Sequence, residues 1–306
     1  MNSISNNRPP YSVLECLSIQ NSNLRYTGDG HMNKSWIAFY DNEPTYVLKQ
    51  YNESRELEDI KKEHHVLNLL SSCLDCEIPK PLRDVITHDG VNFALFQFIR
   101  GDHPLDTIET IKSVAKFIAR VHEDINSSAL LLPYEVEPTS SKVAKPFIIL
   151  NALNDLGGCY AEQEFHDHIK CFYQRVKNTL EELTENLNHK HLIHGDFGLT
   201  NLITTDGDKL ALIDWDEMRI DSPLMDVAGF CAFSEQASDK SVREEFIESY
   251  LSELQRIGYK NYALIKAGLA DVDALIEVVN YIELSEMVKV GMLEEDYLGT
   301  LTGYKK

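Results

Sequence analysis

The 306-residue sequence contains no apolar run that approaches the length needed to cross a bilayer. Residues 1–10 are polar and lack the apolar core of a signal peptide, so we expect them to form a flexible leader. Basic residues are few: 29 Lys and Arg stand against 49 Asp and Glu, giving a net charge of −20. Because nucleic acids and anionic membranes select basic surfaces, this balance argues against both as partners. It is compatible with a cationic substrate, and equally with acidity that serves solubility alone.

Cysteine is also sparse. The six cysteines are scattered along the chain, which indicates reduced thiols and a cytoplasmic location. Cys73 and Cys76 have the spacing of a metal or redox pair, but no second Cys/His pair of matching spacing accompanies them. We therefore interpret them as ordinary, partly buried thiols. With 43% apolar residues and no internal repeat, the chain is long enough for two lobes that each have a core.

A hairpin is the clearest local signal. Residues 202–205 and 210–213 are strand-like, and the Asp206-Gly207 pair between them is typical of a tight turn. A two-residue turn places Asn201 opposite Leu212. The side chains that flank the two strands then meet at the open end of the hairpin.

Oxygen-bearing side chains near this hairpin indicate phosphate chemistry. Under the two-residue turn, Asn201 and Asp214 lie about 7 Å apart along the strand direction. One amide and one carboxylate are hard oxygen ligands that suit Mg²⁺. Asp196 lies just upstream, where a separate carboxylate can accept a hydroxyl proton. The layout predicts phosphoryl transfer; an Asp-rich loop without chemistry is the alternative.

The run His194-Gly195-Asp196, with Asn201 and then Ile213-Asp214-Trp215, resembles the aminoglycoside phosphotransferase and choline kinase family, small-molecule kinases of the protein-kinase-like fold. The later stretch 221–228 continues the pattern, except that Ser222 separates an Asp and a Pro that the family usually has adjacent. The resemblance implies an α+β, bilobal fold. Its N-lobe would be a small antiparallel sheet over residues 11–100, and its C-lobe would be mainly helical over residues 101–306.

The same resemblance assigns roles to the motif residues. It implies Asp196 as the base, Asn201 and Asp214 as Mg²⁺ ligands, and ATP as the donor, with GTP left open. In this fold the main chain at the junction of the lobes binds the adenine edge, which falls here on Gln97, Phe98 and Ile99.

We expect strands over residues 12–50: the apolar run 11–19 comes first, and the β-forming runs 36–40 and 45–48 are separated by a turn at 41–44. Gly28 and Gly30 lie in a small polar connection that could place backbone N–H groups over phosphates, although a plain turn explains them as well. Lys49 ends a strand beside apolar side chains, where a lysine needs a carboxylate or a phosphate. In kinase-like folds such a lysine pairs with a helix Glu, for which Glu63 is the candidate. Glu56 and Glu58 compete with it.

The remaining elements follow from periodicity. Strands are expected at 82–87 and 91–98, a helix at 54–74, an irregular segment at 130–146, and further helices at 108–121, 163–187, 223–233, 242–257 and 270–292. Thr107 can cap one of these helices. Carboxylates near the C-terminal helices could hold an ammonium group of the acceptor, or could be solvated faces: Asp216, Glu217, Glu283 and Glu286.

Taken together, the sequence predicts an ATP-dependent kinase that phosphorylates a hydroxyl of a small, cationic molecule, such as an amine-bearing antibiotic. A metabolite kinase acting on choline, an amino alcohol, homoserine or a sugar shares the same motifs. A pseudokinase that only binds nucleotide is the alternative from another class. The protein is expected to be a monomer or a homodimer.

Overall fold

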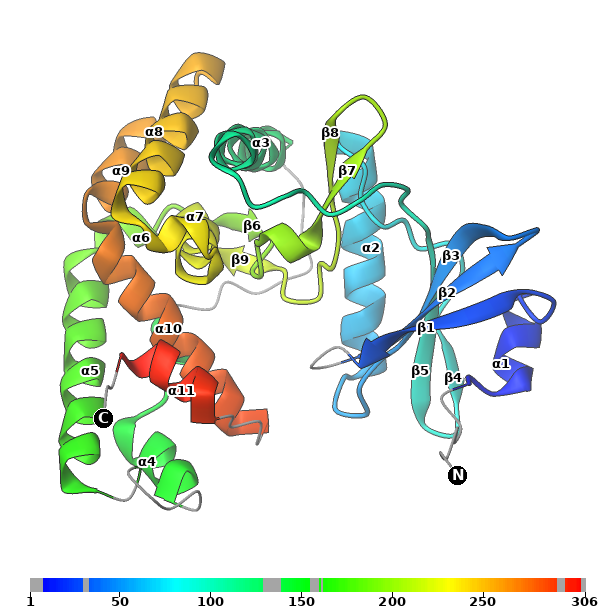
Figure 1. Ribbon diagram of the computed structural model, residues 1–306, viewed down its shortest axis with the longest axis horizontal. Helices are drawn as coiled ribbons and strands as arrows, with labels where there is room; N and C mark the ends of the chain where they lie inside the picture. The colour runs from blue at the N-terminus through cyan, green and yellow to red at the C-terminus, as the bar shows by residue number, and fades with distance from the viewer. Residues whose placement is uncertain are drawn as a thin grey trace. The chain divides into compact units, whose positions relative to one another are not determined.

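The computed structural model describes residues 8–29, 33–128, 139–154, 160, 162–290 and 295–303 (Figure 1). By its contacts the chain divides into two compact units. The first holds the described residues up to Pro104 together with Thr200–Asp216. The second holds Leu105–Ser127, the described residues from 139 to Leu199, and those from Glu217 onward. The predicted lobe boundaries, 11–100 and 101–306, stay a prediction.

The first unit is built on a five-stranded antiparallel sheet with the strand order β1-β2-β3-β5-β4 (Figure 1). The strands are β1 (Asn23–Asp29), β2 (Lys34–Tyr40), β3 (Glu43–Gln50), β4 (Ile86–His88) and β5 (Val91–Gln97). The strands predicted at 36–40, 45–48 and 91–98 are confirmed, whereas 82–87 forms a strand only at its end.

The strand predicted at the start of the chain is wrong. Residues Tyr11–Cys16 form helix α1, because the Pro10 carbonyl accepts the N–H groups of Val13 and Leu14 and so starts a helical turn. Val13, Leu14 and Leu17 are buried in the cluster that includes Trp36 of the sheet, at helical rather than alternating spacing.

Helix α2 (Leu57–Cys73) confirms the helix predicted at 54–74. Its buried face carries Ile60, Val66, Leu67 and Leu70. Glu63 is buried as well. A carboxylate on an apolar helix face needs a partner there, because burial strongly disfavours an unpaired charge.

The predicted hairpin forms, with β7 (Leu202–Thr205) and β8 (Lys209–Leu212), but its register differs by one residue. Leu202, not Asn201, pairs with Leu212. The turn has three residues because Asp208 as well as Gly207 adopts a positive φ, at 58° and 78°. Asn201 is instead opposite Ile213, whose N–H donates to the Asn201 carbonyl at 2.9 Å.

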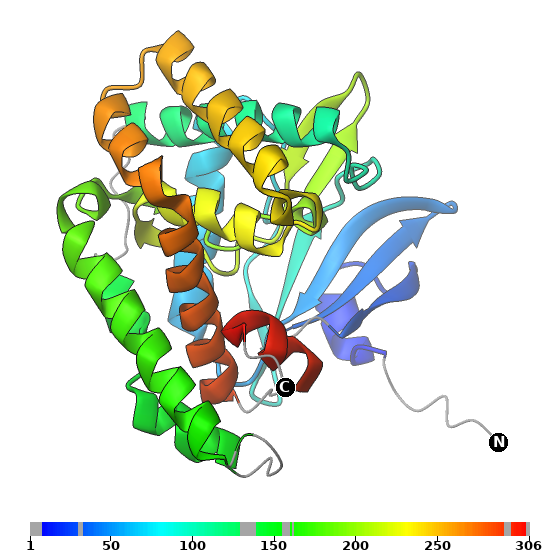
Figure 2. The same ribbon diagram turned by 60° about the vertical axis from the view of Figure 1, so that its left-hand side comes forward.

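The second unit is mainly helical and contains the small sheet of β6 (His191–Ile193) and β9 (Arg219–Asp221). Its described helices of six or more residues are α3 (Ile108–Ser127), α4 (Pro146–Asn154), α5 (Gln163–Glu182), α7 (Pro223–Phe233), α8 (Lys240–Ile257), α9 (Tyr262–Gly268), α10 (Val272–Val290) and α11 (Glu295–Thr302). Helix α3 packs along α8, and α10 packs against α5 and α7 (Figure 2).

Most helix predictions in this unit are confirmed. The Thr107 hydroxyl accepts the Thr110 N–H at 3.2 Å, as expected of a cap, although α3 continues to Ser127. The helix predicted at 163–187 breaks at Leu183 into α5 and the short α6 (Thr184–Leu187). Of the segment predicted to be irregular, 130–146, residues 130–138 lie outside the described part, and α4 begins at Pro146, where the segment ends.

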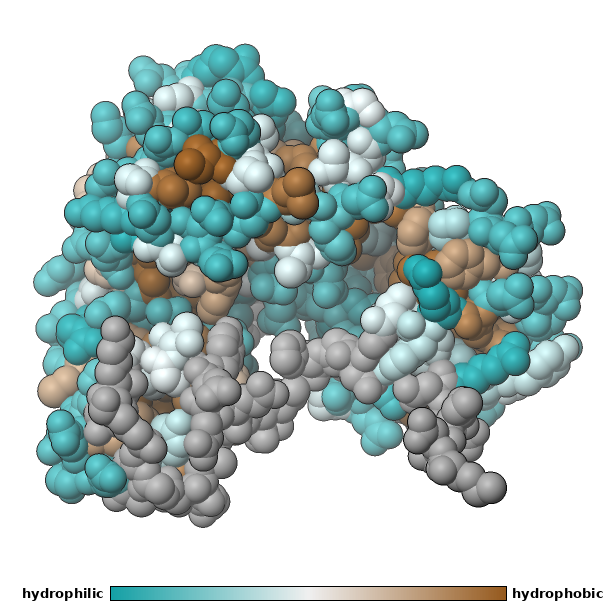
Figure 3. Space-filling view, in the orientation of Figure 1, coloured by the Kyte–Doolittle hydropathy of each residue, from teal (hydrophilic) through white to brown (hydrophobic). Residues whose placement is uncertain are grey.

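Hydrophilic side chains dominate the face shown in Figure 3, as the charge balance leads one to expect. Among the described residues, none of the helices combines the length and the apolar character that crossing a membrane requires.

Candidate active site

Lys49 lies near the end of β3, paired in the sheet with Ala94 of β5. Its side chain is only 13% exposed, and its Nζ lies 3.1 Å from Asp214 Oδ1 and 2.5 Å from Asp216 Oδ1. Burial alone would lower the pKa of Lys49, but Asp216, Asp214 and Glu63 outweigh it and hold the pKa above its ordinary value. Lys49 is therefore a permanent cation beside the end of the β7–β8 hairpin.

Asp216 is held through both of its oxygens. Besides Lys49, Oδ1 lies 3.7 Å from Arg55 Nη1, and Oδ2 accepts a short hydrogen bond from Asn33 Nδ2. The Asn33 side-chain oxygen Oδ1 in turn accepts the Asn52 N–H at 3.0 Å. Because each oxygen has its own donor, the carboxylate plane is fixed. Asp216 is therefore a fixed partner of Lys49, and its contact with the acceptor stays a prediction.

The predicted Lys49–Glu63 ion pair is not the arrangement found. Glu63 pairs with Arg55, whose Nη2 lies 3.0 Å from Oε2, and its Oε1 accepts the Tyr51 hydroxyl at 3.0 Å. Arg55 precedes α2 by two residues and reaches Glu63, while Lys49 is taken by the two hairpin carboxylates. Burial raises the pKa of Glu63, and Asp216 adds to this effect, against the cations Lys49 and Arg55.

The predicted phosphate loop is only partly visible. Gly28 lies in β1, where the pairing with β2 shifts register between Tyr26 and Gly28. Gly30 lies outside the described residues. A role for the two glycines at phosphates stays a prediction.

The segment after β5, predicted to bind the adenine edge, uses two of its three N–H groups internally. The Gln97 N–H donates to the Lys80 carbonyl at 3.0 Å, and the Phe98 N–H donates to the Thr45 carbonyl at 3.2 Å. Within the described part of the chain, the Ile99 N–H has no hydrogen-bond partner. Binding of the adenine edge by this segment stays a prediction.

The β7–β8 hairpin is hydrogen-bonded to Asp102 and His103, which follow that segment in the sequence. Asp102 and Thr204 exchange backbone hydrogen bonds at 3.2 and 2.7 Å, and His103 Nδ1 lies 2.9 Å from the Leu202 carbonyl oxygen. Gly101 has a φ of 145°, and a Cβ there would lie 2.1 Å from the Thr204 carbonyl oxygen. Only glycine permits so close an approach. These contacts fix where the two predicted metal ligands stand.

Asn201 and Asp214 flank the open end of this hairpin. Asn201 is buried at the end of the 3₁₀ turn Leu199–Asn201, while the Asp214 side chain is half exposed and its φ is 57°. The next residue, Trp215, is held in place by its buried indole, which donates a hydrogen bond to the Leu212 carbonyl at 3.0 Å. A left-handed backbone at a non-glycine residue is a strained conformation that surrounding structure must impose.

This donor set fits a hard divalent cation. An amide and a carboxylate oxygen suit Mg²⁺, which keeps several waters and binds phosphate oxygens as well. Among the described residues, no three His, Cys, Asp or Glu side chains gather as a group that could hold a metal ion. Asn201 and Asp214 would therefore supply a minority of the ligands.

In the second unit, the loop that carries Asp196 is held from below by Asp226 of α7. Asp226 Oδ2 accepts the His194 N–H at 3.0 Å, and Oδ1 accepts the Gly195 N–H at 2.8 Å. His122 Nε2 of α3 lies 3.2 Å from Oδ2, and its Nδ1 lies 2.9 Å from the Tyr250 hydroxyl. His122 directly follows the helix predicted at 108–121, but α3 continues past it, so His122 is buried inside the helix and orients Asp226.

Asp196 itself is exposed, as a residue that meets substrate must be. Its N–H donates to His194 Nδ1 at 3.3 Å, which makes His194 a structural part of the loop. Gly195 has a φ of 88°, and a Cβ there would lie 2.1 Å from the Glu217 carbonyl oxygen. Asp196 belongs to the second unit, whereas Asn201 and Asp214 belong to the first. The convergence of the three side chains stays a prediction.

The predicted acceptor carboxylates divide between the units. Glu217 is exposed, and Glu286 pairs with Lys289 at 2.8 Å on α10, where Glu283 is half-buried. Lys142, which sequence reasoning missed, is influenced by both Glu217 and Glu286. Burial and then Arg219 lower the pKa of Lys142, and these carboxylates act against that shift.

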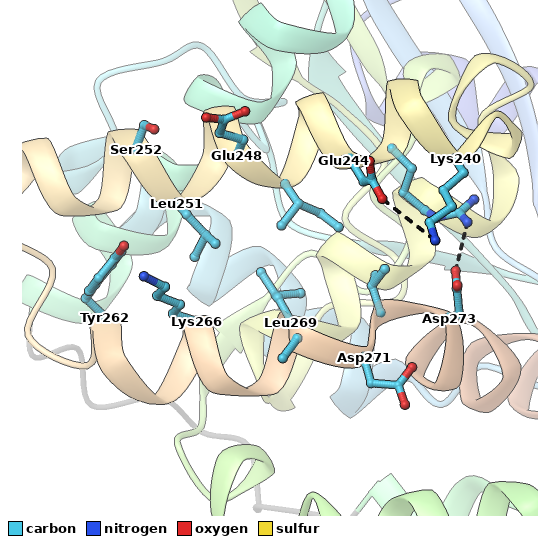
Figure 4. A pocket seen from close by; sticks show the side chains of 14 residues that line it. Lys240, Glu244, Glu248, Leu251, Ser252, Tyr262, Lys266, Leu269, Asp271 and Asp273 are labelled. Atoms are coloured by element: carbon cyan, nitrogen blue, oxygen red, sulfur yellow. Dashed lines mark ion pairs between the residues drawn. The ribbon is translucent and has the colours of Figure 1, made fainter.

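A groove of about 450 Å³ lies elsewhere on the second unit, between α8, α9 and α10 (Figure 4). Its floor includes Leu251 and Leu269, and the ion pair of Arg243 with Asp273, at 2.8 Å, lies in it. None of the predicted site residues lines this groove.

Sequence reasoning missed Arg55 and Asn33 and gave Asp226 no role beyond the motif. Arg55 carries no local signal, because its partner Glu63 lies eight positions on and Asp216 is far away in the chain. The sequence did carry a signal for Asp226, because it is a carboxylate in the apolar first turn of a helix. A buried charge requires hydrogen-bond donors, so a structural role for Asp226 could have been predicted.

A comparison with protein-family models matches residues 26–264 to the phosphotransferase enzyme family. A comparison with curated proteins gave no match. Among solved structures, the GDP complex of wild-type aminoglycoside 2'-phosphotransferase-IIIa is similar to this chain, with a TM-score of 0.67 and 14% identity over 96% of this chain and 95% of that one.

Two further structures are similar. The gentamicin–APH(2")-IIa complex has a TM-score of 0.60 and 18% identity, over 95% of this chain and 98% of that one. The amicoumacin kinase hAmiN, in complex with AMP-PNP, Ca²⁺ and Ami, has a TM-score of 0.63 and 12% identity, over 97% and 92%. They confirm the bilobal protein-kinase-like fold, with its antiparallel N-lobe sheet and mainly helical remainder. Because the family model spans most of its length, the chain belongs to the phosphotransferase enzyme family, with the aminoglycoside phosphotransferases among its structural neighbours.

Proposed function

We propose that this protein is a kinase that transfers the γ-phosphoryl group of ATP to a hydroxyl of a small molecule. The observation that carries the proposal is the buried Lys49, whose ammonium lies 3.1 Å from Asp214 at the end of the β7–β8 hairpin. A cation and a carboxylate so placed match the requirements of a site that positions phosphates and their metal ion.

In this mechanism Lys49 binds oxygens of the donor phosphates, and Asn201 and Asp214 would hold Mg²⁺. The bound ion would supply positive charge that stabilises the transferring phosphoryl group. The acceptor oxygen attacks the γ-phosphorus, the bond between that phosphorus and the bridging oxygen breaks, and ADP leaves. Asp196 orients the hydroxyl and takes its proton. Asp226 keeps the loop of Asp196 in place through the His194 and Gly195 amides.

For the acceptor we propose an amine-bearing molecule of the aminoglycoside type. The net charge of −20 favours cationic ligands. Structural neighbours are complexes with kanamycin, gentamicin and streptomycin. On this chain, Glu217, Glu283 and Glu286 are carboxylates of the second unit that could pair with ammonium groups by charge-assisted hydrogen bonds.

The test is a screen of aminoglycosides, amino alcohols, nucleosides and sugars with Mg²⁺ and ATP, followed by mass detection of the phosphorylated product. With the best acceptor, Asp196→Asn should lower turnover by a factor of about 10²–10⁴, the usual contribution of a positioned base. Asp206→Asn, in the exposed turn of the hairpin, is the matched control and should turn over normally. Wild-type turnover by Asp196→Asn would remove the base assignment. ATP binding without any product across the screen would favour a pseudokinase.

A further inference from the structure

Arg55 has no part in the mechanism above, yet it lies among the groups that have one. It stands in the connection between β3 and α2, and its side chain is 21% exposed. Its guanidinium contacts Glu63 at 3.0 Å and approaches Asp216 Oδ1 at 3.7 Å. All these residues belong to the first unit. The cluster is thus an internal feature of that unit.

Lys49 and Arg55 are brought together by one oxygen. Asp216 Oδ1 lies 2.5 Å from Lys49 Nζ and 3.7 Å from Arg55 Nη1, so the two nitrogens are at most about 6 Å apart. Both cations also lie over the ring of Tyr51, with Lys49 Nζ at 5.6 Å and Arg55 Cζ at 5.4 Å from its centroid. The shared carboxylate and the shared ring hold the two positive charges side by side.

Because Glu63 pairs with Arg55, the Lys49 ammonium is not needed as its partner. In the expected scheme a single lysine serves both the helix carboxylate and the nucleotide. Here Arg55 takes Glu63, which is 3% exposed, and Lys49 remains beside Asp214. Anionic phosphates that approach Lys49 therefore also come within reach of a guanidinium, whose planar fork of N–H donors matches phosphate oxygens better than an ammonium does.

We propose that Arg55 is a second phosphate-binding residue of the nucleotide site, held beside Lys49 by their shared contact with Asp216. The inference rests on the proposed kinase function and adds a residue to its donor site. The competing explanation is that Arg55 only neutralises the buried Glu63. The two explanations differ in one measurable respect: a phosphate contact depends on how many phosphates the ligand carries, whereas a structural contact does not.

The experiment measures binding of adenosine, AMP, ADP and ATP to the full chain by calorimetry, with and without Mg²⁺. Arg55→Met should weaken ADP and ATP binding by about tenfold to a hundredfold, the range for lost hydrogen bonds to a charged group. Adenosine should bind within twofold of wild type. Lys61→Met is the matched control, because Lys61 lies on α2, is half exposed and pairs with Glu58 at 2.6 Å. It should bind all four ligands as wild type does.

Each outcome decides the matter. Equal weakening for all four ligands, or unchanged ADP binding, would overturn the proposal and leave Arg55 a structural residue. If Arg55→Met fails to fold, Arg55→Met with Glu63→Met removes both members of the buried pair and restores an apolar contact. The same loss restricted to ADP and ATP is then expected. A wild-type protein that binds ADP no better than adenosine would instead refute the proposed function itself.

Discussion

Replacing Asp226 by Asn tests whether one buried carboxylate fixes the loop of Asp196. Asp226 is 2% exposed and receives the His194 N–H, the Gly195 N–H and His122 Nε2. The best orientation of the new amide keeps its oxygen at the Oδ2 position, where two of the donors meet. Its NH₂ group then faces the Gly195 N–H, so two donors oppose each other and that hydrogen bond is lost.

The magnitude follows from these contacts. A buried donor left without a partner costs about 1–3 kcal/mol, and the remaining hydrogen bonds lose the strength that the charge gave them. We expect the free energy of opening this loop to fall by about 2–4 kcal/mol. Hydrogen exchange at the His194 and Gly195 amides should then become roughly 30- to several-hundredfold faster.

The pH dependence has a definite sign. Burial acts to raise the pKa of Asp226, but His122 and the Gly195 N–H outweigh it and hold the pKa below its ordinary value. The stabilisation is therefore complete above the unfolded pKa of about 3.9 and is lost as pH falls through the lower folded value. The deficit of Asp226→Asn should be constant from pH 8 to about 5 and should shrink only below about pH 4.

The assay is hydrogen exchange followed by mass spectrometry on peptides that cover 191–200, from pH 8 down to pH 3, which spans both parts of the predicted pH dependence. Asp239→Asn is the control, because Asp239 caps α8 and Asn caps a helix equally well. Exchange in Asp226→Asn within twofold of wild type would show that the loop does not depend on this carboxylate.

Two further predictions concern single positions. Burial, and then Lys49, lower the pKa of His64 to about 4, so His64 contributes stability above the unfolded pKa of about 6.5 that is lost as pH falls to 4. The wild type should lose about 3 kcal/mol more than His64→Gln between pH 7 and pH 4 in urea unfolding; parallel curves would contradict this. Gly195→Ala should unfold at a much lower urea concentration than Gly207→Ala, because a Cβ at Gly195 lies 2.1 Å from the Glu217 carbonyl oxygen, whereas nothing lies within 4 Å at Gly207. Equal midpoints would show that the loop at Gly195 relaxes freely.

Much of the fold can be predicted from the sequence, because long segments with a regular apolar period bury one face. The periodicity of 223–233 predicts α7 to the residue, and the Asp206-Gly207 pair predicts the hairpin. The register of that hairpin is not legible, since it depends on Asp208 adopting a positive φ. The strand predicted at 11–19 was wrong for a related reason. A short apolar run fits both the helical and the strand period, and burial against Trp36 favours the helix here.

The sequence could nominate candidate site residues where a motif is local, and their roles stay predictions. Asp196, Asn201 and Asp214 stand in one short stretch, so spacing alone selects them. The partner of Glu63 depended instead on packing between β3, the connection after it and the β7–β8 hairpin. No spacing rule distinguishes Arg55 from other basic residues, because the choice between two cations is made by a carboxylate more than 150 positions away.

The first unit takes Thr200–Asp216 from far along the chain, and this affects how the protein is made. A ribosome that has released residues up to Pro104 has synthesised the five-stranded sheet but not the hairpin that contacts Lys49. The Lys49 ammonium can contact Asp214 and Asp216 only after residue 216 has left the ribosomal tunnel. By then much of the helical unit is already outside the tunnel. Truncation before that point leaves Lys49 without Asp214 and Asp216, so nascent chains of intermediate length should depend on chaperones.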